Sequence, residues 1–254
     1  AIRRQRQMCI RDRMDTVDKM QKWHGHLYNW YRTDTLEVMR PRYVSTVDSG
    51  NFCACLITGS MALKKYGRED TAARLERAAR ETDFSALYDA ERKLFRIGYD
   101  GDACELSNSW YDLLASEARL TSLIAVALGS VKPEHWFKLG RQMAPVLGGT
   151  LVSWSGTMFE YLMPVLFTGA VPDTLLYNSC LNAVKAQKRQ RYGGVWGISE
   201  SGYYAFDRNM YYQYRAFGLQ RISLMSCREH GRVISPYSTM LALAFDPRGA
   251  CENL

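Results

Sequence analysis

The chain has 254 residues, of which 47% are hydrophobic and 23% are charged, and it carries a formal net charge of +7 at pH 7. This composition excludes a disordered polymer, and the length suffices for a substantial buried core. Five arginines and one aspartate in the first 13 residues account for more than half of the net charge. The rest of the chain is ordinary in charge, so we expect no nucleic-acid partner.

The reactive residue types give no sign of a metal or cofactor. The seven cysteines are scattered without a Cys-x-x-Cys pair, and the four histidines form no ligand cluster. We therefore expect reduced thiols, no metal and no organic cofactor. No apolar run approaches the length of a membrane span, so this segment itself is predicted to be soluble.

The first 13 residues differ from everything that follows. Residues 1–13 show neither helical periodicity nor a capping pattern, and they resemble translated sequencing-adapter sequence. We expect a non-native tail rather than a genuine basic arm. Residues 14–254 would then be the folded part, as one helical domain truncated at both ends.

The elements expected along the chain are mostly helices. A loop over 41–51 precedes an all-round apolar helix at 52–65, with Asp48 or Ser49 as its N-cap. A short extended segment at 94–102 and Gly/Ser/Tyr-rich loops separate the other helices. These helices are expected over residues 69–92, 110–128, 133–143, 157–168, 173–190 and 234–245. Strands are expected to be few and short, which predicts an all-α fold.

Three segments place a carboxylate among aromatic and hydroxyl residues. They are Asn108–Arg119 with Glu117, Ser153–Tyr161 with Glu160, and Gly197–Asp207 with Glu200. Sugars offer CH faces that stack on aromatic rings and hydroxyls that bind carboxylates. Cleavage or transfer of a glycosidic bond generally uses two carboxyl groups in different roles. The pattern therefore indicates a carbohydrate-processing site.

Each acid also has a structural reading. Glu117 falls among the apolar positions of the helix expected at 110–128, where it could form a salt bridge with Arg119 or could be a desolvated proton donor. Glu200 lies in a Gly/Ser loop and could be a solvated loop acid or project into a cleft. Glu160 begins an apolar helix and is either a buried structural acid or an acceptor for sugar hydroxyls.

Five longer motifs occur in one order along the chain. The first two are His24-Gly-His-Leu-Tyr-Asn-Trp-Tyr31 and Pro41-Arg-Tyr-Val-Ser-Thr-Val-Asp-Ser-Gly-Asn51. The others are Ser109-Trp-Tyr-Asp-Leu-Leu-Ala-Ser-Glu-Ala-Arg-Leu120, Ser153-Trp-Ser-Gly-Thr-Met-Phe-Glu-Tyr-Leu-Met-Pro164 and Trp196-Gly-Ile-Ser-Glu-Ser-Gly-Tyr203. Together they closely resemble the glycoamylase-like central domain of bacterial cyclic β-1,2-glucan synthases, over residues 14–254.

The resemblance implies a fold and a reaction. The fold would be an (α/α)6-barrel around an acid-lined cleft, incomplete here because the chain is too short for six helix pairs. The reaction would be a retaining transglycosylation that cyclises linear β-1,2-glucan, without a cofactor. Glu117 would be the general acid/base and Glu200 the nucleophile. The substrate would be bound by Asp48, Tyr111, Asp112, Trp154, Glu160, Trp196 and Tyr203.

The parent enzymes of this family are large proteins of the bacterial inner membrane. The resemblance places this segment on the cytoplasmic side, with the membrane-embedded regions outside it. Phe52-Cys-Ala-Cys55 departs from the family's usual continuation, which puts a role for Asp48 in doubt. Two alternatives stay open: an inverting β-1,2-glucan endohydrolase on the same fold, and a non-catalytic glucan-binding module. A carboxyl separation of about 5 Å would indicate the retaining reaction, and about 6.5–9.5 Å the inverting one.

Overall fold

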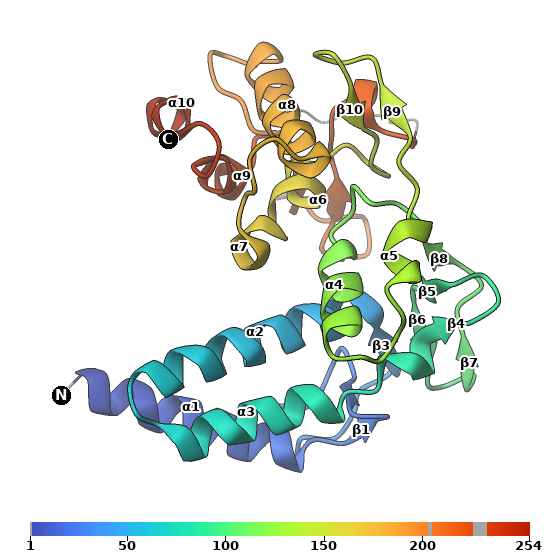
Figure 1. Ribbon diagram of the computed structural model, residues 1–254, viewed down its shortest axis with the longest axis vertical. Helices are drawn as coiled ribbons and strands as arrows, with labels where there is room; N and C mark the ends of the chain where they lie inside the picture. Colours follow the sequence, from blue (N-terminus) through green and yellow to red (C-terminus); the bar gives the residue numbers. More distant parts are fainter. Residues whose placement is uncertain (1, 203–204, 226–232) are drawn as a thin grey trace. The chain divides into compact units, whose positions relative to one another are not determined.

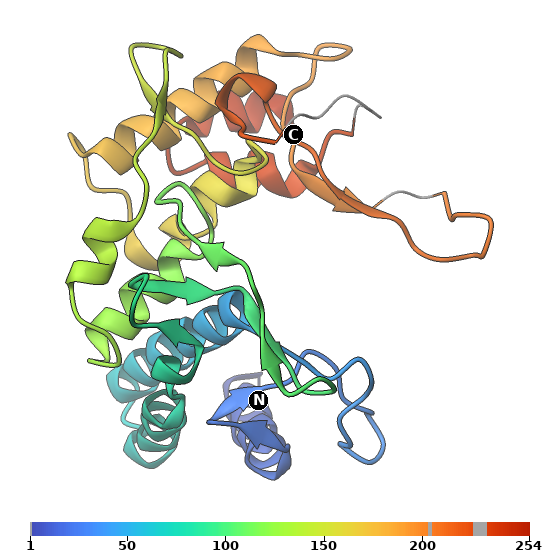
Figure 2. The same cartoon turned by 90° about the vertical axis from the view of Figure 1, so that its right-hand side faces the viewer.

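The structure is a computed structural model that describes residues 2–202, 205–225 and 233–254. Its contacts divide the chain into two compact units (Figures 1 and 2). The first unit comprises Ala1–Asp112 and Leu120–Lys138, and the second comprises Leu113–Arg119 and Leu139–Leu254. The sequence predicted a single helical domain, because no Pro- or Gly-rich linker separates the two parts.

Three long helices form one side of the first unit: α1 (Ile2–Lys19), α2 (Thr46–Lys65) and α3 (Glu69–Glu81) (Figure 1). The side chain of Ser45 accepts the backbone N–H of Asp48 at 3.2 Å and caps α2. The prediction of Asp48 or Ser49 as the N-cap is therefore wrong, and the helix begins earlier than residue 52. The expected helix over 69–92 ends at Glu81.

Helix α1 occupies the region that the sequence placed outside the fold. Its partly buried Ile10 and Val17 pack against the core of the first unit. Arg74 of α3 forms ion pairs with Asp15 at 2.8 Å and Asp18 at 2.6 Å. Helix α1 is thus joined to α3 through Asp15 and Asp18. The adapter origin of residues 1–13 stays a prediction.

Short antiparallel strands connect the helices of the first unit. They form a β1–β2 pair and two three-stranded sheets, ordered β3-β6-β7 and β4-β5-β8. The 3-10 helix η1 (Phe84–Leu87) precedes β4, and helices α4 (Arg119–Ala127) and α5 (Glu134–Lys138) follow β8. The strands are β1 (Lys22–Trp23), β2 (His26–Leu27), β3 (Tyr43–Ser45), β4 (Tyr88–Asp89), β5 (Leu94–Arg96), β6 (Gly98–Asp100), β7 (Glu105–Leu106) and β8 (Trp110–Tyr111).

The helix predicted over 110–128 begins only at Arg119. Residues 113–116 are buried one after another, whereas a helix on a surface exposes part of each turn. The apolar spacing that predicted one helix therefore covers two pieces of structure. They are a buried irregular segment and the helix α4 that follows it. The helix predicted over 133–143 is likewise shortened to α5.

The core of the first unit is centred on aromatic residues. Phe84 and Phe95 are fully buried, and their ring centroids lie 6.3 Å apart in an edge-to-face arrangement. His135 packs edge-on against Phe95 at 4.8 Å, and its ring binds the hydroxyl of Ser122 and the carbonyl of Lys93. The buried histidine is thus fully paired, as a core histidine should be.

The second unit packs helices around the short helix α6. Helix α6 (Met158–Leu162) contacts α8 (Leu175–Arg189) and α9 (Pro236–Ala242), and α8 also contacts β10. The hydroxyl of the buried Tyr161 on α6 donates to the carbonyl of Leu151 at 2.5 Å. The remaining elements are β9 (Met143–Ala144), β10 (Thr150–Leu151), α7 (Val165–Thr168), β11 (Glu200–Gly202), β12 (Tyr214–Ala216), η2 (Gln220–Ile222) and α10 (Pro247–Asn253).

Helices and small sheets therefore coexist: the strands are short, as the sequence predicted for an all-α fold, but more numerous than expected. The helices predicted over 173–190 and 234–245 are present, as α8 and α9. The short strands were underestimated because strands of two or three residues carry too little alternation to be recognised. Closure of the helices into a barrel stays a prediction.

Candidate active site

The segment that leads to Glu200 is held by side-chain amides from two helices. The carboxamide of Gln187 on α8 both accepts from the N–H and donates to the carbonyl of Ile198, each at 2.8 Å. Asn253 on α10 makes the same pair of bonds with Trp196, at 3.0 and 2.8 Å. Buried backbone groups outside helices and sheets need such partners. The two amides fix the path of the chain up to Glu200.

Glu200 is the first residue of β11, and not the loop residue that the sequence predicted. It pairs with Ala216 of β12 in an antiparallel hairpin, which Figure 2 shows projecting from the helices of the unit. Tyr214 lies two residues before Ala216, and the two side chains therefore share a face of the strand. The Tyr214 hydroxyl donates to Oε2 of Glu200 at 2.6 Å.

The surroundings of Glu200 favour its protonated form. Burial raises the pKa of the Glu200 carboxyl group above its ordinary value, and the negative charge of Glu160 raises it further. The hydrogen bond from Tyr214 acts in the opposite direction. Burial and the neighbouring Glu200 also raise the pKa of the Tyr214 hydroxyl, which stays protonated and can donate. Glu200 can therefore hold a proton at a higher pH than a solvated glutamate.

The main chain at Glu200 is fixed by a second tyrosine. The hydroxyl of Tyr237 on α9 lies 2.8 Å from Ser199 Oγ and 2.9 Å from the carbonyl oxygen of Glu200. A phenol has one proton, so its donation to Glu200 leaves Ser199 to donate to Tyr237. Ser199 is fully buried and accepts the N–H of Phe159 on α6 at 3.1 Å. The backbone before β11 is thus tied to both α6 and α9.

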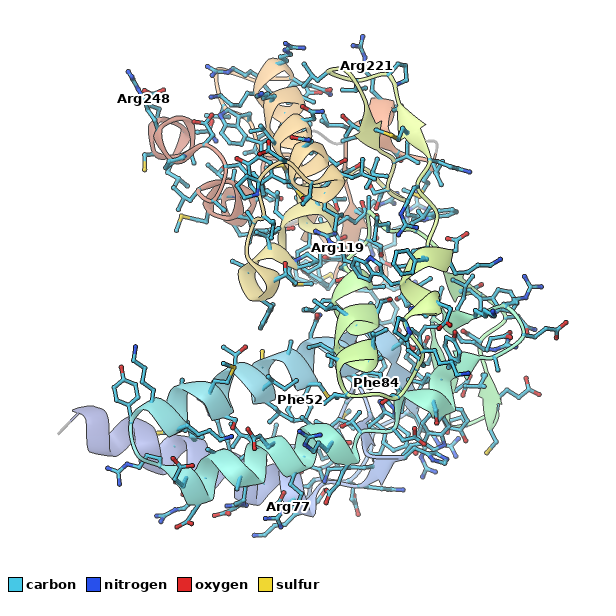
Figure 3. The ribbon with its side chains drawn as sticks, viewed as in Figure 1. Phe52, Arg77, Phe84, Arg119, Arg221 and Arg248 are labelled. Carbon is cyan, nitrogen blue, oxygen red and sulfur yellow. The ribbon has the colours of Figure 1, made fainter. Side chains whose placement is uncertain are left out.

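Glu117 lies in a turn just before α4 and is half-buried. Two residues later comes Arg119, which is buried and is labelled in Figure 3. Its guanidinium group donates to three backbone carbonyls. These carbonyls belong to Ser116 at 2.9 Å, Glu160 at 2.6 Å and Tyr161. Arg119 therefore anchors the turn that carries Glu117 onto α6.

Glu117 and Glu200 act on the same two tyrosines. Besides burial, the charges of both carboxyl groups raise the pKa of the Tyr214 and Tyr237 hydroxyls. Both acids belong to the second unit. Their joint use as a catalytic pair stays a prediction.

Glu160 is already saturated with hydrogen bonds. Its Oε2 accepts the Ser153 hydroxyl at 2.9 Å and the backbone N–H and hydroxyl of Thr157 at 2.9 and 3.1 Å. The N–H of Ser155 donates to Oε1 at 3.1 Å. With Thr157 as N-cap, this is a capping box at the start of α6. The arrangement supports the structural reading of Glu160, and contact with a sugar stays a prediction.

The aromatic residues proposed for the substrate are placed differently from one another. The side chain of Trp154 is 60% exposed and can offer a ring face to a sugar. Trp196 is only 1% exposed, so its ring is part of the core of the second unit, and the expectation of a stacking role does not fit this burial. Its aromatic neighbours in the sequence made both readings possible. Tyr203 lies outside the described residues.

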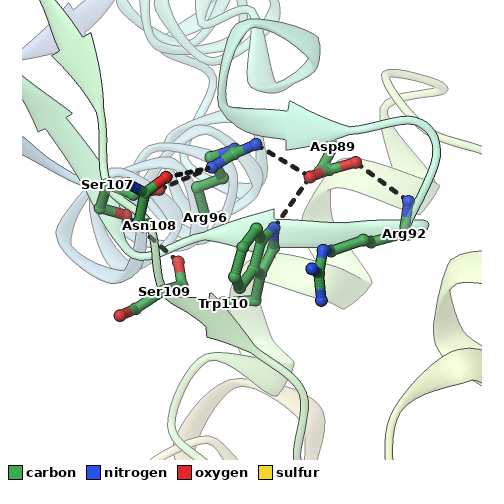
Figure 4. A network of polar contacts seen from close by, with 7 residues as sticks. All are labelled: Asp89, Arg92, Arg96, Ser107, Asn108, Ser109 and Trp110. Carbon is green, nitrogen blue, oxygen red and sulfur yellow. Dashed lines mark hydrogen bonds and ion pairs between the residues drawn. The ribbon is translucent and has the colours of Figure 1, made fainter.

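Tyr111 and Asp112 follow a polar network in the first unit, drawn in Figure 4. Asp89 accepts the indole N–H of Trp110 at 3.0 Å, and the guanidinium of Arg92 lies 3.9 Å from the Trp110 ring centroid. This network fixes strand β8, which contains Tyr111. Asp112 comes directly after the strand and is exposed. A role for either residue in substrate binding stays a prediction.

Asp48 lines a cavity of about 400 Å³ in the first unit, where the two N-terminal motifs meet. Burial lowers the pKa of His26, and its Nε2 lies 2.9 Å from the carbonyl of Asp83. With Nε2 as the donor of a neutral ring, the buried and unpartnered Nδ1 is an acceptor. Trp30 is 49% exposed. The cavity is lined by Gly25, His26, Leu27, Tyr28, Asn29, Trp30, Asp48, Ser49, Phe52 and Thr82.

Two residues next to the acids were missed by sequence reasoning. Tyr214 belongs to a tyrosine-rich stretch of the sequence, residues 203–215, in which no pattern singles out one ring. Tyr237 stands alone between Pro236 and Ser238, and no local pattern indicates it. Only the packing of α9 against α6 brings it to Glu200.

The described part of the chain contains neither a group of metal ligands nor a helix suited to crossing a membrane. Across residues 2–202, 205–225 and 233–254, no three His, Cys, Asp or Glu side chains are grouped so that they could hold a metal ion. None of the helices in those ranges combines the length and the apolar character that crossing a membrane requires.

Comparison with known proteins gives matches in sequence and in structure. The chain is 31% identical, over 94% of its length, to the cyclic β-(1,2)-glucan synthase NdvB of Rhizobium meliloti. An endo-β-1,2-glucanase from Chitinophaga pinensis, solved with sophorotriose and glucose, superimposes with a TM-score of 0.74 at 16% identity, covering 98% of this chain and 65% of that one. One from Talaromyces funiculosus, solved with β-1,2-glucan, gives 0.77 at 14% identity, covering 96% and 57%. No family model matches the chain.

The match in sequence confirms the resemblance carried by the motifs, and the matches in structure show a shared fold. The chain spans 13% of the length of the synthase. The alignment extends over 369 residues, which is more than the 254 residues of this chain. The synthase therefore has residues inside the matched region that have no counterpart here.

Proposed function

Because the chain is related over 94% of its length to a segment of a cyclic β-(1,2)-glucan synthase, we propose that it processes β-1,2-glucan by retaining transglycosylation. The observation that carries the proposal concerns Glu117 and Glu200. The charges of both carboxyl groups raise the pKa of the Tyr214 and Tyr237 hydroxyls. Retaining glycosidases use two such carboxyl groups, one as nucleophile and one as acid/base.

The reaction has two displacements. In the first, a carboxylate attacks the anomeric carbon, the glycosidic C–O bond breaks, and the leaving oxygen takes a proton from the second carboxyl group. In the second, a hydroxyl at the other end of the same glucan attacks the glycosyl ester. That hydroxyl gives its proton to the second carboxylate, and the first carboxylate leaves. The products are a ring and the displaced remainder of the chain.

The surroundings of Glu200 bear on the division of roles. A proton donor benefits from a raised pKa, whereas a nucleophilic carboxylate must be ionised. Burial and the charge of Glu160 raise the pKa of Glu200, which suits Glu200 to the acid/base role. The family resemblance implies Glu200 as the nucleophile, and the pair is the same in both divisions.

Each unit by itself offers side chains that could bind a glucan. Trp154 in the second unit and the cavity with Trp30 and Asp48 in the first offer ring faces and hydrogen-bond acceptors for sugars. We further infer a glycoamylase-like barrel for the complete domain. From the same resemblance we infer that the chain is part of a larger membrane protein, on the cytoplasmic side of the inner membrane.

A second candidate is hydrolysis of β-1,2-glucan, favoured by the shared fold with two endo-β-1,2-glucanases. Mass spectrometry of the products from linear β-1,2-glucan separates the candidates. Cyclic products, lighter by one water than linear chains of equal length, support transglycosylation, and shortened linear products support hydrolysis. Glucan that is bound but unchanged would contradict both and leave a binding module.

A further inference from the structure

We propose that Tyr214 is a positioning residue for Glu200, whose hydroxyl fixes one carboxyl oxygen and so determines which oxygen exchanges a proton with the substrate. The inference deepens the proposed function and rests on it. Tyr214 donates to Oε2 of Glu200 at 2.6 Å. In a protonated carboxyl group the carbonyl oxygen is the stronger acceptor, so the bond to Oε2 favours the proton on Oε1.

The exposure of Tyr214 shows that its ring is not needed for packing. The side chain is 57% exposed, in contrast to the fully buried Tyr161 of the same unit. A ring that remains in solvent gains little from burial. Its hydroxyl, however, makes a short bond to a charged-type acceptor, the stronger class of hydrogen bond. The contact with Glu200 is therefore the principal interaction that defines this side chain.

The hairpin register brings the tyrosine to the carboxyl group. Glu200 is opposite Ala216, and Tyr214 is opposite Gly202. Tyr214 and Glu200 are thus diagonal neighbours on one face, roughly 7–8 Å apart at the backbone, a span that a tyrosine can bridge. Gly202 has no side chain, and the phenol of Tyr212 packs against it, 2.0 Å from where a Cβ would lie. The pairing of β11 with β12 consequently sets the geometry of the carboxyl group.

Side chain and main chain of Glu200 are held by different tyrosines. Tyr237 bonds the Glu200 carbonyl and Ser199, so it fixes where the residue lies. Tyr214 bonds Oε2, so it fixes how the side chain is turned. This division allows the effect of Tyr214 to be separated from a general disturbance of the segment.

The charged and titratable groups around Glu200 determine the sign of the expected effect. They are Tyr214 on β12, Tyr237 on α9, Glu160 on α6 and Glu117 in the turn before α4. Burial and the charge of Glu160 raise the pKa of Glu200, and the bond from Tyr214 lowers it. Removal of the hydroxyl therefore raises the pKa of Glu200 further.

The test is Tyr214→Phe, with kcat and KM measured for linear β-1,2-glucan across pH. Misplacement of a reacting group lowers kcat by roughly 10- to 100-fold, and we expect KM to change little. With Glu200 as acid/base, the alkaline limb of the profile moves to higher pH. The control Tyr211→Phe removes a hydroxyl from a 67% exposed side chain of the same hairpin and should follow the wild type. A Tyr214→Phe profile identical to the wild type overturns the proposal.

A second readout does not depend on turnover. The pKa of Glu200 can be followed by NMR of 13C-labelled glutamate, with Glu200→Gln to assign its signal. A higher pKa in Tyr214→Phe than in the wild type supports the positioning contact even if no glucan is processed, in which case only the proposed function fails. If the wild type processes glucan but the titration of Glu200 is the same in Tyr214→Phe as in the wild type, the positioning role alone is overturned.

Discussion

Glu160 and Glu200 show how the surroundings of a carboxyl group decide what it can do. Glu160 accepts bonds from Ser153, Ser155 and Thr157, which stabilise it in place at the start of α6. Glu200 is half-buried, lies near another acid and accepts the Tyr214 hydroxyl. The first arrangement is that of a structural acid, and the second is that of a group that can exchange a proton.

The raised pKa of Glu200 predicts a stability cost at neutral pH. A carboxyl group whose pKa is higher in the folded than in the unfolded state binds more protons when folded, between the two pKa values. Stability therefore falls as pH rises through that window, beginning near the ordinary glutamate value of about 4. Glu200→Gln removes this loss, so its Tm at neutral pH should exceed that of the wild type.

Thermal unfolding at two pH values measures this effect. The difference in Tm between Glu200→Gln and the wild type should vanish at or below about pH 4, where the unfolded-state carboxyl is also protonated. Glu252→Gln on the exposed surface of α10 is the control and should show no such pH dependence. A Glu200→Gln variant that is less stable than the wild type at neutral pH would contradict the inferred environment.

At the scale of elements, the approach to α6 depends on a glycine. Gly156 has a φ of +71°, and a Cβ there would lie 2.5 Å from the carbonyl oxygen of Leu219. Gly169 has almost the same φ, +70°, with no atom within 4 Å of its Cβ position. Both positions favour glycine through their backbone conformation, but only Gly156 is also required by a close approach.

This pair predicts a difference in stability. Gly169→Ala should cost about 1–3 kcal/mol, because a φ of 70° with a ψ of 174° is a conformation that essentially only glycine adopts. Gly156→Ala should cost at least about 1–3 kcal/mol more, because the added atom overpacks the backbone that holds the N-terminus of α6. Denaturant unfolding measures both values. Equal costs for the two substitutions would show that the approach of Leu219 is not rigid.

The elements also show what the sequence could and could not predict. The long helices α2 and α8 were predicted, although α2 begins before residue 52. Thr157 with Glu160 fits the capping-box spacing, which the sequence analysis did not use. The turn at Glu117 was taken for helix because its buried apolar run continues into α4. The β11–β12 hairpin could not be predicted, because a Ser/Gly/Tyr-rich segment has no alternation of apolar and polar residues.

At the scale of the whole molecule, the candidate acids were predictable while their partners were not. Motif order identified Glu117 and Glu200 from residues 83 positions apart in sequence. The neighbouring Tyr237 and the clamps from Gln187 and Asn253 depend on helices that pack together only in the fold. The sequence therefore predicts the candidate acids, whose roles stay a prediction, but not the side chains that hold them.

The central claim is that Glu117 and Glu200 together process β-1,2-glucan, and turnover of linear β-1,2-glucan by the single variants tests it most directly. Glu117→Gln and Glu200→Gln should each lower kcat by roughly 100-fold or more, while Tm shows that the protein remains folded. Glu252→Gln should retain wild-type turnover. If the wild type processes the glucan and either acid variant does so at the same rate, the account of the site is wrong.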